Sequence, residues 1–295
     1  MNEPGDPSAA HRLASSAASA IRRRLFVVGC PRSGTTLLQS FLAAHPDVQS
    51  FPETAVFARL LIAPQRADRA SGEESRVAAA RQRAGAFLDS VARPDLAAPL
   101  ARPEAGSIAG FAQAFVSVLD RLTLERDRIA WAEKTPRHLL VVPEIRRLVP
   151  ESRFIVIVRD GRQNVASLYE AARNHPNVWW PQGRSDVDEA ITRWNTFLRH
   201  AHAIRDASDV RIVRYERLVE ETERTLEEMC AFAELPYSPE MMERRVEAAR
   251  DVVTAIEPWK AGVLGPLRTH DDKFVRVFSA EQKAYIEAHL DPIGF

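Results

Sequence analysis

Apolar positions along the chain fall into short, continuous runs that alternate with stretches of helical spacing. Runs of four or five apolar, largely β-branched residues predict buried strands. Four such strands are predicted at Leu25–Val28, Ile129–Glu133, Phe154–Val158 and Val210–Val213, and Val48–Phe51 is predicted as a further short strand. Helical spacing predicts helices between them, from Leu37 to about Ala44, over residues 139–148, from Arg162, and from Asp186 or Asp188 to about Arg205. After the last strand, a further helix is predicted near Pro239–Arg250. This alternation predicts an α/β fold with a central, mainly parallel sheet flanked by helices.

Two stretches interrupt this alternation. Residues 1–20 are rich in Ala, Ser, Pro and Gly and predict a disordered tail, with a loose helix as the alternative. Residues from about 55 to 128 alternate helical patterns with Pro and Gly breakers, which predicts a helical insertion. We therefore expect one domain over residues 21–295 carrying this insertion, and we interpret the many arginines of the insertion as a solvated face.

Three predicted strands end in turns that carry polar and charged side chains. Because the carboxyl ends of parallel strands meet at one edge of a sheet, these turns are expected to share a ligand site. The turns are Arg32-Ser33-Gly34-Thr35-Thr36, Arg159-Asp160-Gly161 and Arg214-Tyr215-Glu216.

The first of these turns has the form of an anion-binding loop. It joins a strand to the start of a helix, where backbone N–H groups and the positive end of the helix point at the ligand. Gly29 and Gly34 have the spacing of a nucleotide-hydrolysing P-loop, but Thr35 stands where that motif has lysine. The loop is therefore predicted to hold a phosphate or a similar group without serving a γ-phosphate. A simple strand–helix connection is the alternative from this stretch alone.

Composition sets limits on the partners and the compartment. The formal net charge is zero, so no overall field favours nucleic acid or an anionic membrane. The two cysteines, Cys30 and Cys230, are too few for a disulfide framework or a cysteine-rich metal site. No stretch has the ~20 apolar residues that span a bilayer, and the arginines at 22–24 precede too short an apolar run for a signal peptide. A cytoplasmic protein is expected.

With these residues in view, the chain resembles the sulfotransferase family, which transfers a sulfuryl group from 3′-phosphoadenosine 5′-phosphosulfate (PAPS). GCPRSGTTLLQSFLAAHPDV looks like the family's 5′-phosphosulfate loop and first helix, and FIVIVRDGRQNVASL looks like its 3′-phosphate segment. Further likeness lies at Lys134-Thr135-Pro136, Trp194-Asn195, Tyr215-Glu216 and Lys273-Phe274-Val275. The pattern is most similar to tyrosylprotein sulfotransferases and related bacterial enzymes, with a P-loop-like fold.

The resemblance implies a role for each matched residue. Those expected to bind the 5′-phosphosulfate are Arg32, Ser33, Gly34, Thr35 and Thr36. Arg159 and Ser167 are expected to hold the 3′-phosphate, and Tyr215 and Lys273 to contact the nucleotide. PAPS carries no γ-phosphate, so the missing lysine is consistent with this donor, and no metal is expected to be required.

Catalysis of sulfuryl transfer needs a base for the acceptor hydroxyl and a cation for the leaving oxygen. Glu53, after the second strand, is the candidate base, and Lys134, at the end of the neighbouring strand, is the candidate cation. A surface carboxylate or helix cap is the alternative for Glu53, and a surface lysine for Lys134. His138 and His175 are alternative bases.

Three functions remain compatible with these features. A sulfotransferase is favoured; a kinase or ATPase with a degenerate loop, using Asp160 for magnesium, and a non-catalytic nucleotide-binding protein are the alternatives. The acceptor remains open among carbohydrate, peptidyl tyrosine, lipid and small natural product hydroxyls. Trp179 and Trp180 suit an acceptor cleft and a protein core equally. The sequence does not predict the oligomeric state.

Overall fold

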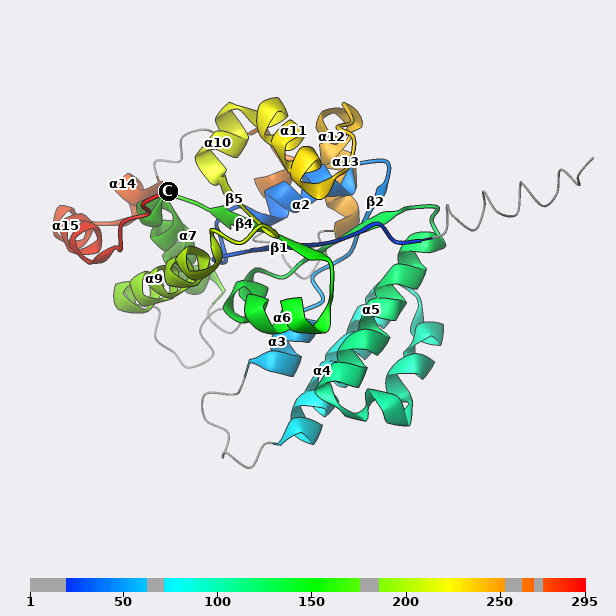
Figure 1. Cartoon of the computed structure of the whole chain (residues 1–295). Helices are drawn as coiled ribbons and strands as arrows, with labels where there is room; N and C mark the ends of the chain where they lie inside the picture. Colours follow the sequence, from blue (N-terminus) through cyan, green and yellow to red (C-terminus); the bar gives the residue numbers. More distant parts are fainter. Residues whose placement is uncertain (1–19, 63–71, 176–185, 253–261, 268–272) are drawn as a thin grey trace, which may run out of the picture.

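A five-stranded parallel sheet forms the centre of the molecule in the computed structural model (Figure 1). The structure describes residues 20–62, 72–175, 186–252, 262–267 and 273–295. The sheet has the order β2-β3-β1-β4-β5. Its strands are β1 (Arg23–Gly29), β2 (Val48–Ser50), β3 (Ala130–Lys134), β4 (Ser152–Val158) and β5 (Val210–Arg214). The predicted fold class is confirmed.

The central strands are buried because their side chains pack against helices on both faces of the sheet. Leu25, Phe26, Val27 and Val28 of β1 are all fully buried. Alternate residues point to opposite faces of a strand, so Phe26 belongs to one apolar cluster and Val27 to the other. The uninterrupted apolar runs of β1 and β4 follow from this double coverage.

One face of the sheet is covered by the first helix and by helices that follow β5 (Figure 1). α2 (Thr35–Ala43) packs there through Leu38, Phe41 and Leu42, and it contacts α13 (Arg245–Val252). The same layer contains α10 (Tyr215–Glu220), α11 (Thr222–Ala233) and α12 (Glu240–Glu243). α2 starts directly after the predicted anion loop, so this packing fixes the direction of the helix N-terminus.

The opposite face carries a second layer of helices. They are α3 (Val56–Leu61), the 3₁₀ segment η3 (Pro136–Val141), α6 (Val142–Leu148), α7 (Gly161–Asn174), α9 (Val187–Ile204), α14 (Lys273–Val277) and α15 (Ala280–His289). The predicted insertion is helical where it is described: α3 is followed by α4 (Glu73–Ser90), η1 (Pro94–Ala101), η2 (Pro103–Gly106) and α5 (Ile108–Leu124). α3 packs against α4, so the insertion reaches the segment that follows β2.

Three predicted boundaries are corrected by the structure. The first helix begins at Thr35 rather than Leu37, so both threonines of the loop lie in its first turn. The helix predicted over residues 139–148 is a 3₁₀ segment followed by α6, and Pro143 lies in the first turn of α6, where its missing N–H is tolerated. The helix predicted near residues 239–250 is divided into α12 and α13. Residues 1–19 of the predicted tail, Trp179 and Trp180 lie outside the described residues.

Candidate active site

The loop between β1 and α2 is built to present backbone N–H groups at the helix start. Gly34 has φ +99°, a left-handed conformation that favours glycine, and it precedes Thr35 at the first position of α2. Among the described residues, no side chain caps this helix start, so its first N–H groups are available to an anion. Ser33 is buried and its hydroxyl donates to the Cys30 carbonyl, so its side chain closes the loop.

The loop is tied to the helix after β4. Asn164 of α7 donates its amide to the Pro31 carbonyl at 3.2 Å, and the Cys30 thiol donates to the Asn164 side-chain oxygen at 3.3 Å. Burial raises the pKa of the Cys30 thiol far above its ordinary value, so the thiol stays protonated and behaves as a small loop residue.

Two predicted donor-binding arginines meet beside this loop. Arg32 donates from Nε to the Ser167 hydroxyl at 3.2 Å, although the two residues belong to different predicted phosphate sites. The Arg159 guanidinium lies over the Tyr215 ring, 4.5 Å from its centroid, and its Nη1 reaches the Arg32 carbonyl at 3.5 Å. Burial and the charge of Arg159 lower the pKa of Arg32. Two close guanidinium groups repel each other, and a bound anion would relieve that repulsion.

Lys273 reaches the same region from the C-terminal part of the chain. Its ammonium lies 2.7 Å from a carboxylate oxygen of Glu170 on α7. Glu170 in turn acts electrostatically on Arg32. The nine predicted donor-binding residues therefore come from the β1 loop, the β4–α7 segment, the start of α10 and α14, at the edge of the sheet where the strands end.

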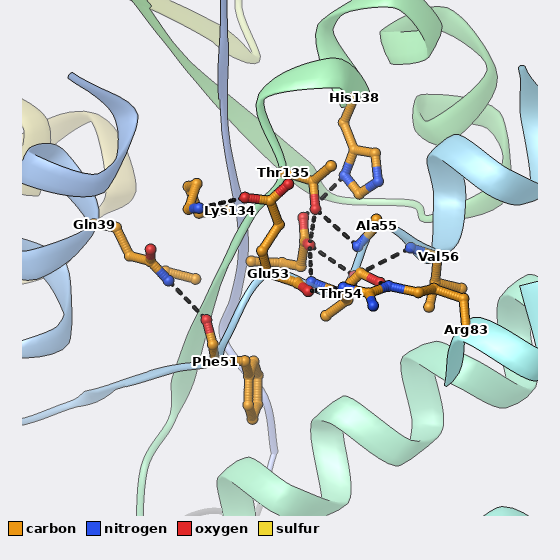
Figure 2. A network of polar contacts seen from close by, with 12 residues as sticks. Gln39, Phe51, Glu53, Thr54, Ala55, Val56, Arg83, Lys134, Thr135 and His138 are labelled. Atoms are coloured by element: carbon orange, nitrogen blue, oxygen red, sulfur yellow. Dashed lines mark hydrogen bonds and ion pairs between the residues drawn. The ribbon is translucent and has the colours of Figure 1, made fainter. Parts of the chain in front are cut away.

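The two predicted catalytic residues form an ion pair. The Lys134 Nζ lies 2.7 Å from the Glu53 Oε2 (Figure 2). Lys134 ends β3 and is paired in register with Val27 of β1, while Glu53 follows β2 on the other side of β3. The Lys134 side chain is 1% exposed and that of Glu53 28%. The alternative that Lys134 is a surface lysine is therefore wrong. Of the two side chains, only that of Glu53 is open to solvent.

A buried carboxylate lies beside this ion pair and was not predicted as part of the site. Glu133 is fully buried, and one of its oxygens accepts hydrogen bonds from the Thr54 backbone N–H, the Thr54 hydroxyl and the Thr135 hydroxyl. Its other oxygen lies 2.9 Å from Nδ1 of His138. Burial opposes ionisation, but the His138 charge and these hydrogen bonds hold the pKa of Glu133 below its ordinary value.

His138 is not placed to act as a base. Its side chain is fully buried and packs edge-on against Phe26 and Phe57, which lie on β1 and α3. The alternative base is therefore reassigned as the partner of Glu133. The sequence did carry a signal for this pair: Glu133 is an acidic residue inside an otherwise apolar strand. A buried charge needs a partner, and His138 is close by in the sequence.

Two further side chains hold the segment that carries Glu53. Arg83 of α4 donates to the carbonyls of Glu53 and Thr54, and Gln39 of α2 donates to the Phe51 carbonyl at 2.7 Å (Figure 2). Gln39 also donates to the Ser50 hydroxyl at 3.1 Å. Arg83 contradicts the interpretation of the insertion arginines as a solvated face. Asp160, proposed above for magnesium, caps α7 through Gln163 N–H and pairs with Arg162.

Proteins of similar sequence are named as tyrosine sulfotransferases. The chain is 28% identical over 222 residues to a putative protein-tyrosine sulfotransferase of Caenorhabditis briggsae, covering 74% of this chain and 68% of that protein. It is 27% identical over 217 residues to protein-tyrosine sulfotransferase 1 of Danio rerio, covering 72% of this chain and 54% of that one. The chain thus spans between about half and two thirds of the length of these relatives.

These relatives overturn one sequence-based expectation. The prediction of a cytoplasmic protein is wrong by this comparison, because protein-tyrosine sulfotransferases are membrane-anchored Golgi enzymes. Within the described segments, the helices are too short or too polar to cross a bilayer.

Solved structures of sulfotransferases share the fold. The sulfotransferase domain of the curacin biosynthetic pathway superposes with a TM-score of 0.59 at 19% identity, covering 91% of this chain and 97% of that one. Mouse sulfotransferase SULT7A1, solved in complex with PAP, gives a TM-score of 0.51 at 14% identity and covers 94% and 86% of the two chains. A family model described as the sulfotransferase family matches residues 24–239. The resemblance read from the motifs is confirmed, and the chain belongs to the sulfotransferase family.

Proposed function

We propose that this protein transfers a sulfuryl group from PAPS to an acceptor hydroxyl, with Glu53 as base and Lys134 as the cation at the leaving oxygen. The observation that carries the proposal is the 2.7 Å contact between Lys134 and Glu53 at the sheet edge that also bears the anion loop. A carboxylate and an ammonium group from adjacent strand ends supply the two charges that the reaction requires.

Binding of the donor follows from the residues around the loop. The first N–H groups of α2 and the Arg32 guanidinium suit the 5′-phosphosulfate. Arg159 and Ser167 suit the 3′-phosphate, and Ser167 already accepts a hydrogen bond from Arg32, so the two anionic groups of the donor would lie against one connected set of side chains. Mouse SULT7A1, a protein of the same fold, was solved in complex with PAP, which supports PAPS as the donor.

Transfer would proceed by in-line displacement at sulfur. The acceptor oxygen forms a bond to sulfur while its proton passes to the Glu53 carboxylate. The bond between sulfur and the bridging oxygen breaks, and its electron pair remains on the 5′-phosphate of PAP. The Lys134 ammonium, which is almost fully buried, would stabilise this developing charge, because electrostatic interactions are stronger away from water.

The acceptor is best sought among tyrosine-containing peptides. The named relatives in worm and fish are protein-tyrosine sulfotransferases. Burial lowers the pKa of Arg137, the charges of Arg193 and Arg59 lower it further, and Glu53 opposes this change. Arg193 of α9 and Arg59 of α3 thus act on Arg137 of η3 near the candidate base. A group of arginines at the approach to the base suits an acidic peptide.

The test is a transfer assay with sulfur-labelled PAPS. The acceptors are a tyrosine peptide with acidic flanks, the same peptide with neutral flanks, its phenylalanine counterpart, a carbohydrate, a lipid alcohol and a small phenol. We expect label on the acidic tyrosine peptide, release of PAP, and no label on the phenylalanine peptide. Failure of PAP to bind and of every acceptor to be labelled would contradict the proposal.

A further inference from the structure

The segment that carries Glu53 is held by an arginine from the helical insertion. Arg83 lies on α4, and its Nη2 and Nε donate to the carbonyls of Glu53 at 2.7 Å and Thr54 at 2.6 Å (Figure 2). A planar guanidinium that binds two successive carbonyls fixes both the position and the orientation of the backbone between them. The insertion therefore contacts the backbone of the candidate base itself.

The same segment is held from its other side by β3 and the residue after it. The Thr54 N–H donates to the buried Glu133 carboxylate at 3.3 Å, and the Ala55 N–H donates to the Thr135 hydroxyl at 3.0 Å. The carbonyls of Glu53 and Thr54 are thus bound by Arg83 of α4. The N–H groups of Thr54 and Ala55 are bound by the side chains of Glu133 and Thr135, the two neighbours of Lys134 in the sequence. Backbone groups on both sides of the Glu53–Thr54 peptide unit have fixed partners.

The backbone at the end of this segment is in a conformation that requires such support. Ala55 has φ +53° and ψ +14°, a left-handed conformation that is costly for alanine by about 1 kcal/mol. Strained residues persist where the surrounding contacts determine their conformation. Loss of the Arg83 contacts would free the segment to relax and would move the Glu53 carboxylate relative to the Lys134 ammonium.

We propose that Arg83 is a positioning residue for sulfuryl transfer: it holds the backbone of residues 53–54 so that the Glu53 carboxylate meets Lys134 and the acceptor hydroxyl. This inference rests on the proposed role of Glu53 as base. It gives the helical insertion a part in catalysis, because α4 then sets the geometry of the base from outside the sheet.

The same helix offers a matched control in Arg81. Its guanidinium also donates to two carbonyls, those of Leu100 and Ala105 at 2.9 and 3.3 Å, but both belong to η1 and η2 of the insertion. Arg81 and Arg83 are both partly buried and lie two residues apart. Arg81→Ala therefore removes a comparable pair of hydrogen bonds without touching the Glu53 segment.

The test compares Arg83→Ala, Arg83→Lys and Arg81→Ala with the wild-type protein. Melting temperature and PAP affinity report folding and the donor site, and kcat and KM report transfer to the acceptor found with labelled PAPS. Amide hydrogen exchange of a peptide covering residues 54–56 reports the segment directly and requires no acceptor. A displacement of about 1 Å costs roughly 100-fold in rate.

We expect Arg83→Ala to lose about 100-fold in kcat, with PAP affinity unchanged and exchange at residues 54–56 accelerated. Arg83→Lys should recover only part of the rate, since a lysine cannot bind two carbonyls in one plane. Arg81→Ala should lower the melting temperature as much as Arg83→Ala while keeping kcat. The loss in Arg83→Ala should also shrink for acceptors with more acidic hydroxyls, which need the base less.

Equal kcat values in Arg83→Ala and Arg81→Ala, or unchanged exchange at residues 54–56 in Arg83→Ala, would overturn the inference. A different result would overturn the proposed function instead: Glu53→Gln with wild-type transfer would remove Glu53 as the base, whatever Arg83 does. The two failures are thus distinguished by separate variants.

Discussion

Lys134 and Glu53 are 81 positions apart in the sequence, yet their charged atoms lie 2.7 Å apart. The contact follows from the topology, because β2 and β3 are parallel neighbours and both residues lie at or just beyond the carboxyl ends of these strands. An ammonium group beside a carboxylate favours the ionised form of the carboxylate. The contact therefore places the proposed base beside an almost fully buried cation before any substrate binds.

The first prediction concerns this pair. Glu53→Gln and Lys134→Ala should each lower kcat by about 10²–10³, because each removes one charge that acts in the transition state. The double variant should lose less than the product of the single losses, since residues in direct contact are energetically coupled. Single-turnover rates with bound PAPS measure the chemical step without product release.

Lys283→Ala on α15 is the control for this series, because it removes a lysine from a helix that carries none of the predicted site residues. Its rate should match the wild-type rate. Fully multiplicative losses in the double variant would mean that Glu53 and Lys134 do not act together.

The second prediction separates the two anionic groups of the donor. Arg159→Ala and Ser167→Ala should weaken binding of PAP, whereas adenosine 5′-phosphosulfate, which lacks the 3′-phosphate, should bind these variants and the wild type alike. Arg32→Ala should weaken the binding of both ligands, because Arg32 lies in the anion loop and also donates to the Ser167 hydroxyl. Titration calorimetry without added metal measures these affinities.

If Ser167→Ala weakened the binding of adenosine 5′-phosphosulfate as strongly as the binding of PAP, Ser167 would contact the 5′ group of the donor instead. ATP serves as the control ligand and should bind weakly with or without magnesium. Tight ATP binding that depends on magnesium would favour the kinase or ATPase alternative.

Features encoded locally could be predicted from the sequence. β1 and β4 were evident because strands buried on both faces have uninterrupted apolar runs. Since parallel strands end at one edge, the polar turns after β1, β4 and β5 could be placed together without knowing the strand order. Lys134 was proposed from two signals together, its position at the end of a predicted strand and its match to a lysine of the sulfotransferase family.

Features that depend on tertiary contacts could not be predicted. Arg83 lies among many other arginines of the insertion, and nothing in its local sequence distinguishes it from Arg81. Its role appears only when α4 is packed beside the segment after β2. His138 suited a base by residue type, but its burial against Phe26 depends on packing between β1 and η3.

The third prediction concerns Gly34. Its φ of +99° strains any other residue, and a Cβ there would overlap the Tyr215 ring. Gly34→Ala should therefore lower the free energy of unfolding by about 1–3 kcal/mol and weaken PAP binding by displacing Tyr215 or the loop. Denaturant unfolding and calorimetry measure the two effects.

Gly85→Ala is the matched control for Gly34→Ala. Gly85 lies within α4, and a Cβ there would meet no heavy atom within 4 Å. Alanine is favoured over glycine in a helix interior by about 0.5–1 kcal/mol, so this variant should be slightly more stable than the wild type. If the two variants were equally stable, the position of Gly34 would require neither the left-handed backbone conformation nor the absence of a Cβ beside Tyr215.

The fourth prediction concerns the pH dependence of stability through Glu133. Its pKa in the folded protein lies below the ordinary value of 4.5 because His138, Thr135 and Thr54 together outweigh the effect of burial. The unfolded chain therefore binds the proton more readily than the folded protein, so this carboxylate contributes stability that is complete above pH 4.5 and is lost as the pH falls through its folded pKa.

Glu133→Gln should lower the free energy of unfolding by about 3 kcal/mol at neutral pH, because it leaves His138 without its buried partner. The difference from the wild type should shrink as the pH falls from 4.5 through the lower folded pKa of Glu133, since the wild-type carboxyl then becomes protonated as well. Urea unfolding of both proteins over a pH series measures this difference, and its independence of pH would contradict an ionised Glu133.

Salt distinguishes Glu133 from surface carboxylates that also titrate in acid. Hydrogen bonds from Arg217 and Arg211 lower the pKa of Glu228 to about 2, but its side chain is 29% exposed. The pH-dependent difference between the wild type and Glu228→Gln should therefore decline in 1 M salt, which screens exposed charges. The difference for Glu133→Gln should persist there, because solvent ions cannot approach a fully buried carboxylate. If 1 M salt abolished the pH-dependent stability difference for Glu133→Gln as it does for Glu228→Gln, Glu133 would be open to solvent. The segment that carries Glu53 would then not be held by a buried carboxylate on β3.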